Sequence, residues 1–296
     1  MAYFKSWLSM PEGCWFSMKV SILVPAYNEQ ATIGVVLGKL LAVELMDKST
    51  VPWVDKEIIV VDDGSTDQTC QMVEEFLDKH PSAGSVIRLI KQPKNLGKTA
   101  AIATAIEASS GDVIIIQDAD LEYDPREIPG VLYPIFENCA DVVYGSRFLV
   151  KKASRVLYFY HYVANKFLTL LSNVLTNRNM SDIETCYKAF RREVIAPMEL
   201  TSKGFGMEVE ITAMVCKTRA RTYEVPISYY GRTYDEGKKI GVRDGIAAIW
   251  YILYYNLFHP LTQQGQAYIQ TVNRSLKQMH SKTPAGQFHR HDQIQN

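Results

Sequence analysis

A pattern of apolar runs that each end in polar residues constrains the fold of this chain more than any other sequence feature. It occurs in 19–29 (KVSILVPAYNE), 56–69 (KEIIVVDDGSTDQT) and 114–125 (IIIQDADLEYDP). Such near-continuous apolar runs are typical of strands that are covered on both faces. Stretches whose apolar residues recur at helical spacing lie between them, for example 33–41. Strands that alternate with helices predict an α/β fold with a mostly parallel sheet and helices on both faces.

The same pattern predicts where a ligand would bind. In an open parallel sheet, ligands bind outside the carboxyl ends of the strands. The polar clusters at 25–29, 62–67 and 117–122 all follow predicted strand ends. The site is therefore expected at that edge of the sheet. Further strands are predicted at 86–92, 140–147 and 222–232, and further helices at 67–79, 126–138, 205–218 and 243–258.

The polar clusters lack the usual glycine-rich phosphate loops. Neither G-x-G-x-x-G nor G-x-x-x-x-G-K-[ST] occurs in the chain. A divalent cation held by carboxylates is the alternative, because Mg²⁺ and Mn²⁺ prefer oxygen ligands and often bridge to phosphate. Asp118 and Asp120 would lie on the same side of an extended backbone, with Glu122 as a third. A solvated acidic turn is the plain alternative for such a pair, and the matching Asp62-Asp63 at another strand end makes it less favoured.

Composition excludes some classes and sets the expected location. The formal net charge of zero argues against a general nucleic-acid binder. The five cysteines are scattered and odd in number, which is typical of reduced thiols in a cytoplasmic protein. Residues 1–17 have no continuous apolar core typical of a signal peptide, and no run of 18 or more apolar residues occurs.

Seven motifs in order carry a resemblance to a known family. They are ILVPAYNE, VVDDGSTDQT, NLGKTAA, IIIQDADLEYDP, VVYGSRF, SDIETCYKAFRREV and EVPISYYGRTYDEGKK, between residues 19 and about 245. Together they resemble family 2 glycosyltransferases, and most of all the dolichyl- and polyprenyl-phosphate mannose or glucose synthases. The resemblance implies a GT-A nucleotide-diphospho-sugar transferase fold. It implies inverting hexose transfer from GDP-mannose or UDP-glucose to a polyprenyl phosphate, dolichyl or undecaprenyl, with Mg²⁺ or Mn²⁺, at the cytosolic face of a membrane.

The resemblance also implies roles for individual residues. Expected donor contacts are Pro25, Tyr27, Glu29, Asp62, Lys98, Gln117, Asp118 and Lys238. Expected metal ligands are Asp118, Asp120 and Glu122, although relatives often have Gln at the last position. Expected catalytic residues are Asp118, Asp120, Arg147, Asp182 and Arg232. Cys186 and Lys188 depart from the Gly and Arg that the subgroup often has. For Asp62, capping the following turn is the structural alternative, and Asp67 is expected to cap a helix.

A charge asymmetry marks the expected acceptor side. Between Val142 and Ser181 there is no Asp or Glu but there are six basic residues. Within this stretch, 156–175 is aromatic and apolar with polar interruptions, which favours an amphipathic helix in a membrane interface. The segment 246–258 is a second such helix, with Trp250, Tyr251, Tyr254 and Tyr255 as expected anchors. Burial in the core or in a dimer interface is the alternative for both helices.

Other functions compete with this one. Transfer to a hydroxyl on a glycan or lipid would need a base, for which Asp182 or Glu184 would serve. A nucleotidyltransferase is disfavoured because its glycine-rich N-terminal loop is absent, and a non-catalytic subunit is disfavoured because the motif residues are intact. Glu208 and Glu210 are expected to be structural. A membrane-protein partner or a homo-oligomer stays open.

The expected organisation has one large unit. Residues 1–17 form an N-terminal extension and 18–240 the catalytic domain, which includes the acceptor-side helix 156–175. Residues 241–258 form the interfacial helix. Residues 259–296 are expected to be a polar mobile tail, because they are rich in Gln, Ser, Thr and His.

Overall fold

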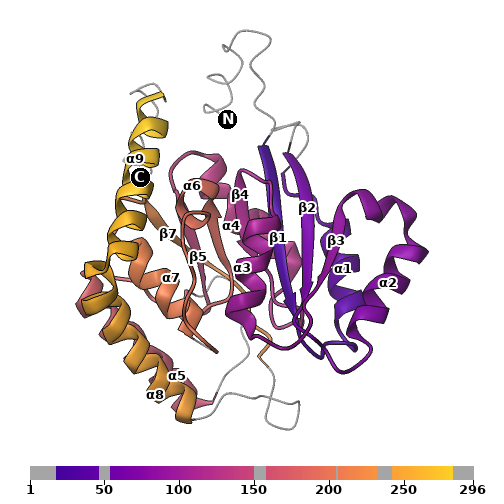
Figure 1. The fold of residues 1–296 in the computed structure, drawn as a ribbon, viewed down its shortest axis with the longest axis horizontal. Helices are drawn as coiled ribbons and strands as arrows, with labels where there is room; N and C mark the ends of the chain where they lie inside the picture. The colour runs from indigo at the N-terminus through magenta and orange to yellow at the C-terminus, as the bar shows by residue number, and fades with distance from the viewer. Residues whose placement is uncertain (1–17, 47–53, 150–157, 205, 232–241, 283–296) are drawn as a thin grey trace, which may run out of the picture.

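The computed structural model describes residues 18–46, 54–149, 158–204, 206–231 and 242–282. These residues form one seven-stranded sheet in the order β3-β2-β1-β4-β6-β5-β7, with helices packed against it (Figure 1). The strands are β1 Met18–Ala26, β2 Val54–Asp62, β3 Ile87–Lys91, β4 Val113–Ile116, β5 Val142–Ser146, β6 Lys188–Arg191 and β7 Thr222–Pro226.

The predicted mostly parallel sheet is confirmed. Every pairing is parallel except those of β6, which runs antiparallel to both β4 and β5. The strand β6 was not predicted, since its four residues include two basic ones and are too few to show a periodicity. It lies in the middle of the sheet between β4 and β5, where only its neighbours specify its place.

Burial of the central residues of β1 shows that both faces of the sheet are covered there. Every residue from Val20 to Val24 is buried, although successive side chains point to opposite faces. The helices are α1 Ile33–Ala42, α2 Thr69–Lys79, α3 Lys98–Ala108, α4 Ile128–Phe136, α5 Phe159–Thr176, α6 Arg192–Ile195, α7 Gly206–Cys216, α8 Val242–Leu253 and α9 Gln263–Lys282. Short 3₁₀ helices occur at Pro81–Ser85, Pro125–Glu127 and His259–Leu261, and a π-helical turn at Tyr254–Phe258 continues α8.

The expectation of a mobile tail is wrong for residues 263–282, which form α9. Tyr268, Val272 and Leu276 recur every four residues and are buried against the rest of the molecule. The Tyr268 hydroxyl donates to the Val194 carbonyl at 3.1 Å, and His280 lies 3.0 Å from Asp141. The polar composition concealed this helix because a narrow apolar stripe, which also includes the partly buried Ile269 and Met279, docks it.

Helices α5 and α8 lie side by side at one corner of the molecule (Figure 1). Both begin on the side toward which the carboxyl ends of the parallel strands point (Figure 1). The predicted helix 156–175 corresponds to α5, and 246–258 to the later part of α8 and the π-helical turn. In the described part of the chain, no helix combines the length and apolarity that crossing a membrane requires.

Candidate functional site

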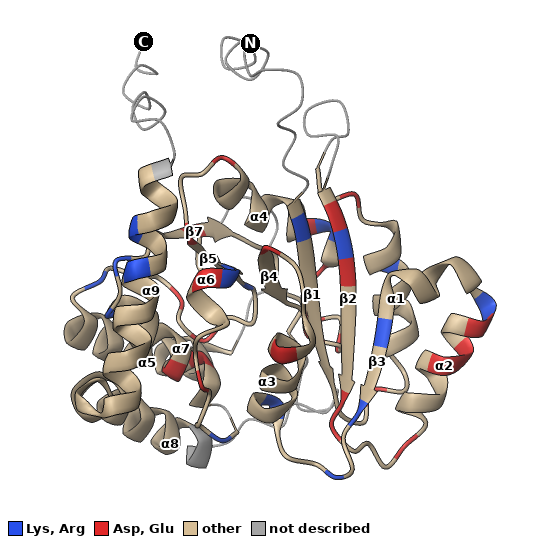
Figure 2. Cartoon of the chain, turned by 45° about the horizontal axis from the view of Figure 1, so that its top comes forward, with Lys and Arg blue, Asp and Glu red and all other residues tan. Residues whose placement is uncertain are grey.

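Polar segments that follow β1, β2 and β4 meet at the carboxyl edge of the sheet. In the register, Ala26 of β1 pairs with Asp62 of β2, and Leu23 of β1 pairs with Ile116 of β4. The segments that follow these strands therefore begin at the same edge, as the sequence predicted. Acidic and basic residues gather around the ends of β2 and β3 and the start of α3 (Figure 2).

The loops after β1 and β2 are locked together beside Asp62. The Asn28 amide donates to Ser65 Oγ at 3.0 Å, and the Thr66 amide donates to Asn28 Oδ1 at 2.8 Å. Asp62 is buried, and its Oδ2 accepts from the Ser65 amide at 3.2 Å, which is the turn-capping role. Its Oδ1 is also buried and has no hydrogen-bond partner among the described residues. A buried acceptor of this kind suits a ligand that brings a donor, such as a ribose hydroxyl or a base N–H.

The other residues expected near the donor occupy different surroundings. Pro25 is half-buried near the end of β1, and Tyr27, in the segment that follows, is 37% exposed. Glu29 accepts from the Thr32 hydroxyl at 3.0 Å at the start of α1. Asp67 accepts from the Thr69 amide at 2.9 Å, which agrees with its expected capping of α2. Arg232 and Lys238 lie outside the described residues.

Lys98 is positioned by the loop that precedes α3. The Asp63 carboxylate accepts from the amides of Leu96 and Gly97, both at 2.8 Å. Gly97 has a φ of 93°, which favours glycine, and it leads directly into Lys98 at the first position of α3. Lys98 Nζ lies 2.9 Å from Asp118 Oδ1 and 3.1 Å from Glu208 Oε1. Burial alone would lower the pKa of Lys98, but the two carboxylates raise it well above the usual range.

Glu208 is the functional candidate that the sequence analysis missed. It lies in the first turn of α7, is buried, and approaches Lys98 across 110 residues of sequence. The one available signal was the presence of two acidic residues, Glu208 and Glu210, inside a largely apolar helix. Glu210 is structural as expected, since its carboxylate accepts from the amides of Thr201 and Ser202, both at 2.9 Å.

The three expected metal ligands are not assembled around one point. Asp118 is paired with Lys98, Asp120 Oδ1 accepts from the Glu122 amide at 3.1 Å, and Glu122 Oε2 accepts from the Tyr229 hydroxyl at 2.7 Å. Among the described residues, no group of three or more His, Cys, Asp or Glu is arranged to hold a metal. Mg²⁺ and Mn²⁺ are often held by one or two carboxylates with substrate phosphates. Asp118 and Asp120 would supply the two carboxylates of such a site, and Glu122 accepts a hydrogen bond from Tyr229.

Gln117 differs from its expected role as a donor contact. Its side chain is completely buried. Its Nε2 donates to the Asp118 carbonyl at 2.9 Å, and its Oε1 accepts from the Tyr187 hydroxyl at 2.5 Å. Because both ends of the amide make hydrogen bonds, Gln117 holds the backbone that carries Asp118. Its buried side chain cannot contact a ligand.

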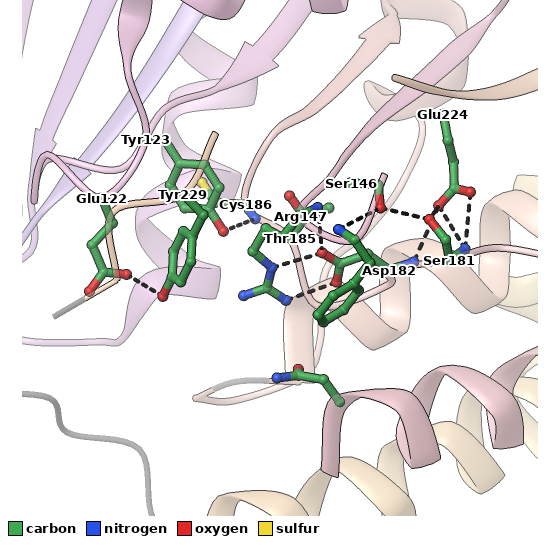
Figure 3. A network of polar contacts seen from close by, with 12 residues as sticks. Glu122, Tyr123, Ser146, Arg147, Ser181, Asp182, Thr185, Cys186, Glu224 and Tyr229 are labelled. Carbon is green, nitrogen blue, oxygen red and sulfur yellow. Dashed lines mark hydrogen bonds and ion pairs between the residues drawn. The ribbon is translucent and has the colours of Figure 1, made fainter. Parts of the chain in front are cut away.

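Arg147 and Asp182 form a buried ion pair (Figure 3). The Asp182 carboxylate accepts from Arg147 Nε at 2.7 Å, from Nη2 at 2.8 Å and from its amide at 3.1 Å. Burial would raise the pKa of Asp182, but Arg147 holds it below the usual value. A carboxylate that is fully buried and shared with a guanidinium is poorly suited to remove a proton. Asp182 instead fixes the position of Arg147.

The pair is connected to both sides of the site (Figure 3). The Arg147 guanidinium lies 5.1 Å from the centre of the Tyr229 ring, and Tyr229 in turn holds Glu122. Behind the pair, Glu224 accepts from the amides of Ser181 and Asp182 at 2.9 and 3.2 Å. Arg147 therefore lies between the turn that carries Asp118, Asp120 and Glu122, called the carboxylate turn below, and residues of β5 and β7.

Glu184 and Lys188 form the interior of the site. Glu184 Oε1 is buried without a hydrogen-bond partner among the described residues. Burial and the neighbouring Glu208 raise the pKa of Glu184 to about 7, although Lys188 and Arg147 oppose the shift. Lys188 is fully buried, donates to the Thr185 carbonyl and lies 5.2 Å from the centre of the Tyr144 ring. Burial lowers the pKa of Lys188, while Glu208 and other acidic neighbours oppose the change.

Replacing Glu184 by Gln should change how stability depends on pH. The pKa of Glu184 is about 7 in the folded protein and 4.5 as the ordinary value, so between these pH values the folded chain holds a proton that the unfolded chain has released. Stability contributed by that proton is therefore lost as the pH rises from 4.5 to 7. Between pH 5 and 8, wild type should lose about 2 kcal/mol of unfolding free energy more than Glu184→Gln. Urea denaturation at both pH values measures this, and parallel curves would contradict the assignment.

Solved structures share this fold. Glucosyl-3-phosphoglycerate synthase of Mycobacterium tuberculosis superimposes with a TM-score of 0.58 at 20% identity, over 81% of this chain and 80% of that protein. It has been crystallised with Mn²⁺, UDP and glucosyl-3-phosphoglycerate, and with Mg²⁺ and UDP. At this identity the likeness shows the GT-A fold alone, which confirms the predicted fold class.

Relatives of known activity match along most of the chain. The dolichol-phosphate mannosyltransferase of Pyrococcus furiosus is 28% identical over 226 residues, which are 76% of this chain and 60% of that protein. The undecaprenyl-phosphate mannosyltransferase of Micrococcus luteus is 28% identical over 250 residues, 79% of this chain and 96% of that protein. The chain thus spans about 60% of the length of the Pyrococcus protein.

A sequence family shows what these likenesses have in common. The family described as Glycosyl transferase family 2 matches residues 21–197, which include most of β1, all of β2 through β6 and the segments around Asp118, Arg147 and Asp182. That range is more than half of the 296 residues. The predicted family is therefore confirmed, and this chain is a glycosyltransferase of family 2.

Proposed function

We propose that this protein transfers a hexose, mannose or glucose, from a nucleotide sugar to a polyprenyl phosphate at the surface of a membrane. The observation that carries the proposal is the contact between the Arg147 segment and α5. The ring of Phe148 lies 5.3 Å from that of Tyr162 on α5, and Lys166 Nζ lies 4.2 Å from the centre of the Phe148 ring. A cationic site thus adjoins an aromatic helix, which is the combination that a lipid phosphate requires.

The outer face of α5 and α8 supports a membrane-facing role. Tyr160 is 84% exposed and Trp250 is 60% exposed. Further exposed apolar residues on these two helices are Phe159, Val163, Phe167, Leu170, Val174 and Ile246. Amphipathic helices of this kind lie in the interface of a bilayer. Of the other expected anchors, Tyr255 is buried and bonded to Thr201, and the Tyr251 hydroxyl accepts from the Lys203 amide, so these two pack inward.

The site residues divide the proposed reaction between donor and acceptor. Asp62 would accept a hydrogen bond from the nucleoside, and Arg147 would hold the acceptor phosphate. A phosphate oxygen is already anionic, so its attack on the sugar needs no general base, which agrees with the engagement of Asp182 by Arg147. A divalent cation held by Asp118 and Asp120 would stabilise the leaving nucleoside diphosphate. The two mannosyltransferases, which by their names act with polyprenyl phosphates, support this choice of acceptor.

Transfer of label into lipid tests the proposal. The protein would be incubated with radiolabelled GDP-mannose or UDP-glucose and Mn²⁺, with or without polyprenyl phosphate in detergent. Label that enters the organic phase only when lipid and Mn²⁺ are both present supports the function and names the donor. Donor hydrolysis that ignores the lipid would overturn the choice of acceptor.

Transfer to a hydroxyl is the second candidate, and Glu184 is the observation that favours it. With its pKa near 7 and one buried oxygen unpartnered, Glu184 is better suited than Asp182 to act as a base. The same assay with glycan or glycolipid acceptors separates the two candidates. A hydroxyl acceptor would show transfer that Glu184→Gln reduces by about 10²-fold or more.

Replacing Tyr160 by Asp should weaken binding to vesicles. The ring is almost completely exposed at the start of α5, so a charge there would disfavour insertion without disturbing the core. We expect roughly a tenfold lower partition coefficient on vesicles that contain anionic lipid, measured by co-sedimentation. Tyr133→Asp is the matched control, because Tyr133 is 52% exposed on α4. Equal losses in both variants would argue against the α5 face as the docking surface.

A further inference from the structure

An internal ammonium group occupies the carboxylate turn of this site. Lys98 Nζ lies between Asp118 Oδ1 and Glu208 Oε1, at 2.9 and 3.1 Å. The side chains of Lys98 and Asp118 are 28% and 20% exposed, whereas that of Glu208 is 6% exposed. The Lys98 ammonium group therefore contacts two carboxylates: that of Asp118 is partly exposed to solvent, and that of Glu208 is buried.

We propose that Lys98 is a resident counter-cation of Asp118 that the divalent cation displaces, and that Glu208 is the positioning residue that retains Lys98 when this happens. The inference rests on the metal-dependent transfer proposed above. A divalent cation on Asp118 would repel the ammonium group, so the two cations would compete for that carboxylate. Metal binding at this site is then an exchange of one cation for another.

Glu208 has the free capacity that such an exchange needs. Its Oε2 is buried and has no hydrogen-bond partner among the described residues, while its Oε1 already accepts from Lys98. An ammonium group has three N–H donors, so Lys98 can engage both Glu208 oxygens once Asp118 is withdrawn. The resulting Lys98–Glu208 pair is neutral, and it leaves Asp118 with its full charge for the metal.

The backbone around both partners restricts the movement to the side chain of Lys98. Asp63 fixes the loop that leads into α3, as described above. A Cβ added at Gly206, which begins α7, would lie 2.6 Å from the Tyr251 ring, so α7 packs closely on α8 near Glu208. The first turn of α3, which carries Lys98, and the first turn of α7, which carries Glu208, are therefore both held in place. This geometry suits a short swing of one ammonium group and requires no shift of either helix.

Binding of Mn²⁺ without donor tests the exchange directly. Titrations followed by the electron paramagnetic resonance of free Mn²⁺ would compare wild type with Lys98→Met, Lys98→Gln and Glu208→Gln. Removing the internal cation should tighten Mn²⁺ binding by about tenfold in both Lys98 variants. Glu208→Gln should weaken it several-fold, because Lys98 then has only Asp118 to neutralise. Lys98→Arg keeps the positive charge and should bind Mn²⁺ much as wild type does.

Matched controls separate this role from general effects of losing a charge. Lys91→Met removes a lysine paired with Glu74 on the surface, and Glu210→Gln removes a buried acid from the same helix α7. Neither should change Mn²⁺ affinity, and thermal unfolding would establish that each variant is folded. An unchanged or weaker Mn²⁺ affinity in both Lys98 variants would overturn the inference.

The outcome also separates this inference from the proposed function. If wild-type transfer requires Mn²⁺ but the Lys98 variants bind it no more tightly, the exchange is wrong and the function stands. If transfer to lipid phosphate fails while the Lys98 and Glu208 variants shift Mn²⁺ affinity in opposite directions, the exchange stands and the acceptor is wrong. If wild type neither binds Mn²⁺ nor needs it for transfer, both the proposed metal site and the proposed cation exchange are wrong.

Discussion

Replacing Asp120 by Asn should reduce sugar transfer by about 10³-fold or more and should weaken Mn²⁺-dependent nucleotide binding, while the fold is kept. Asp120 lies on the turn after β4, where its carboxylate accepts from the Glu122 amide at 3.1 Å. An Asn side chain can accept the same hydrogen bond, so the turn should survive. What the substitution removes is the negative charge that would hold the cation beside Asp118. Steady-state transfer assays and nucleotide titrations with and without Mn²⁺ measure both effects.

Asp124→Asn is the matched control for Asp120→Asn. Asp124 lies four residues further along, where it accepts from the Arg126 amide at the start of a 3₁₀ helix. The Asp124→Asn substitution should therefore lower the free energy of unfolding slightly and leave the rate of sugar transfer almost unchanged. Full transfer activity in Asp120→Asn would remove the carboxylate turn from the mechanism.

The Arg147–Asp182 pair should give the second large effect. Arg147→Met leaves the Asp182 carboxylate fully buried with its charged partner gone. Breaking a buried pair in this way costs about 3–5 kcal/mol of unfolding free energy, and transfer should also be lost because the acceptor phosphate loses its cation. Urea denaturation measures the first effect and the lipid assay measures the second.

A double variant separates the two effects of Arg147→Met. In Arg147→Met/Asp182→Asn the buried charge is neutralised, so stability should return in part while transfer stays absent. Asp182→Asn alone should lower the rate modestly if the acceptor is a phosphate. A loss of about 10²-fold in that single variant, with Arg147 still in place, would identify Asp182 as a base and favour a hydroxyl acceptor.

Local sequence patterns determined the class of fold and the edge that carries the site. The strands β1, β2 and β4 each contain a continuous apolar and buried stretch, at 22–24, 58–61 and 113–116, so these stretches had to be covered on both faces, and a parallel sheet is the arrangement that does this. Polar residues after each run could then meet only at the carboxyl edge. The positions of Asp62, Asp118 and Asp120 in the site follow from these patterns.

The strand β6 and the helix α9 could not be predicted, because the contacts that determine them join residues far apart in the sequence. The strand β6 is too short to show a period, and its antiparallel direction depends on its neighbours β4 and β5. The helix α9 is polar in composition, and only its stripe of buried residues docks it. In both cases the deciding interactions are with segments that lie far away in the sequence.

The sequence by itself determined which residue types surround the site, and the tertiary structure decided which of them touch. Lys98 meets Glu208 from α7, and the Arg147 guanidinium pairs with the Asp182 carboxylate. The Tyr229 hydroxyl donates a hydrogen bond to Glu122, a contact that the sequence did not predict. The physical reason is that hydrogen bonds and ion pairs act over about 3 Å. Which charged side chains come that close is fixed by the packing of helices and strands, and periodicity along a single segment carries no record of it.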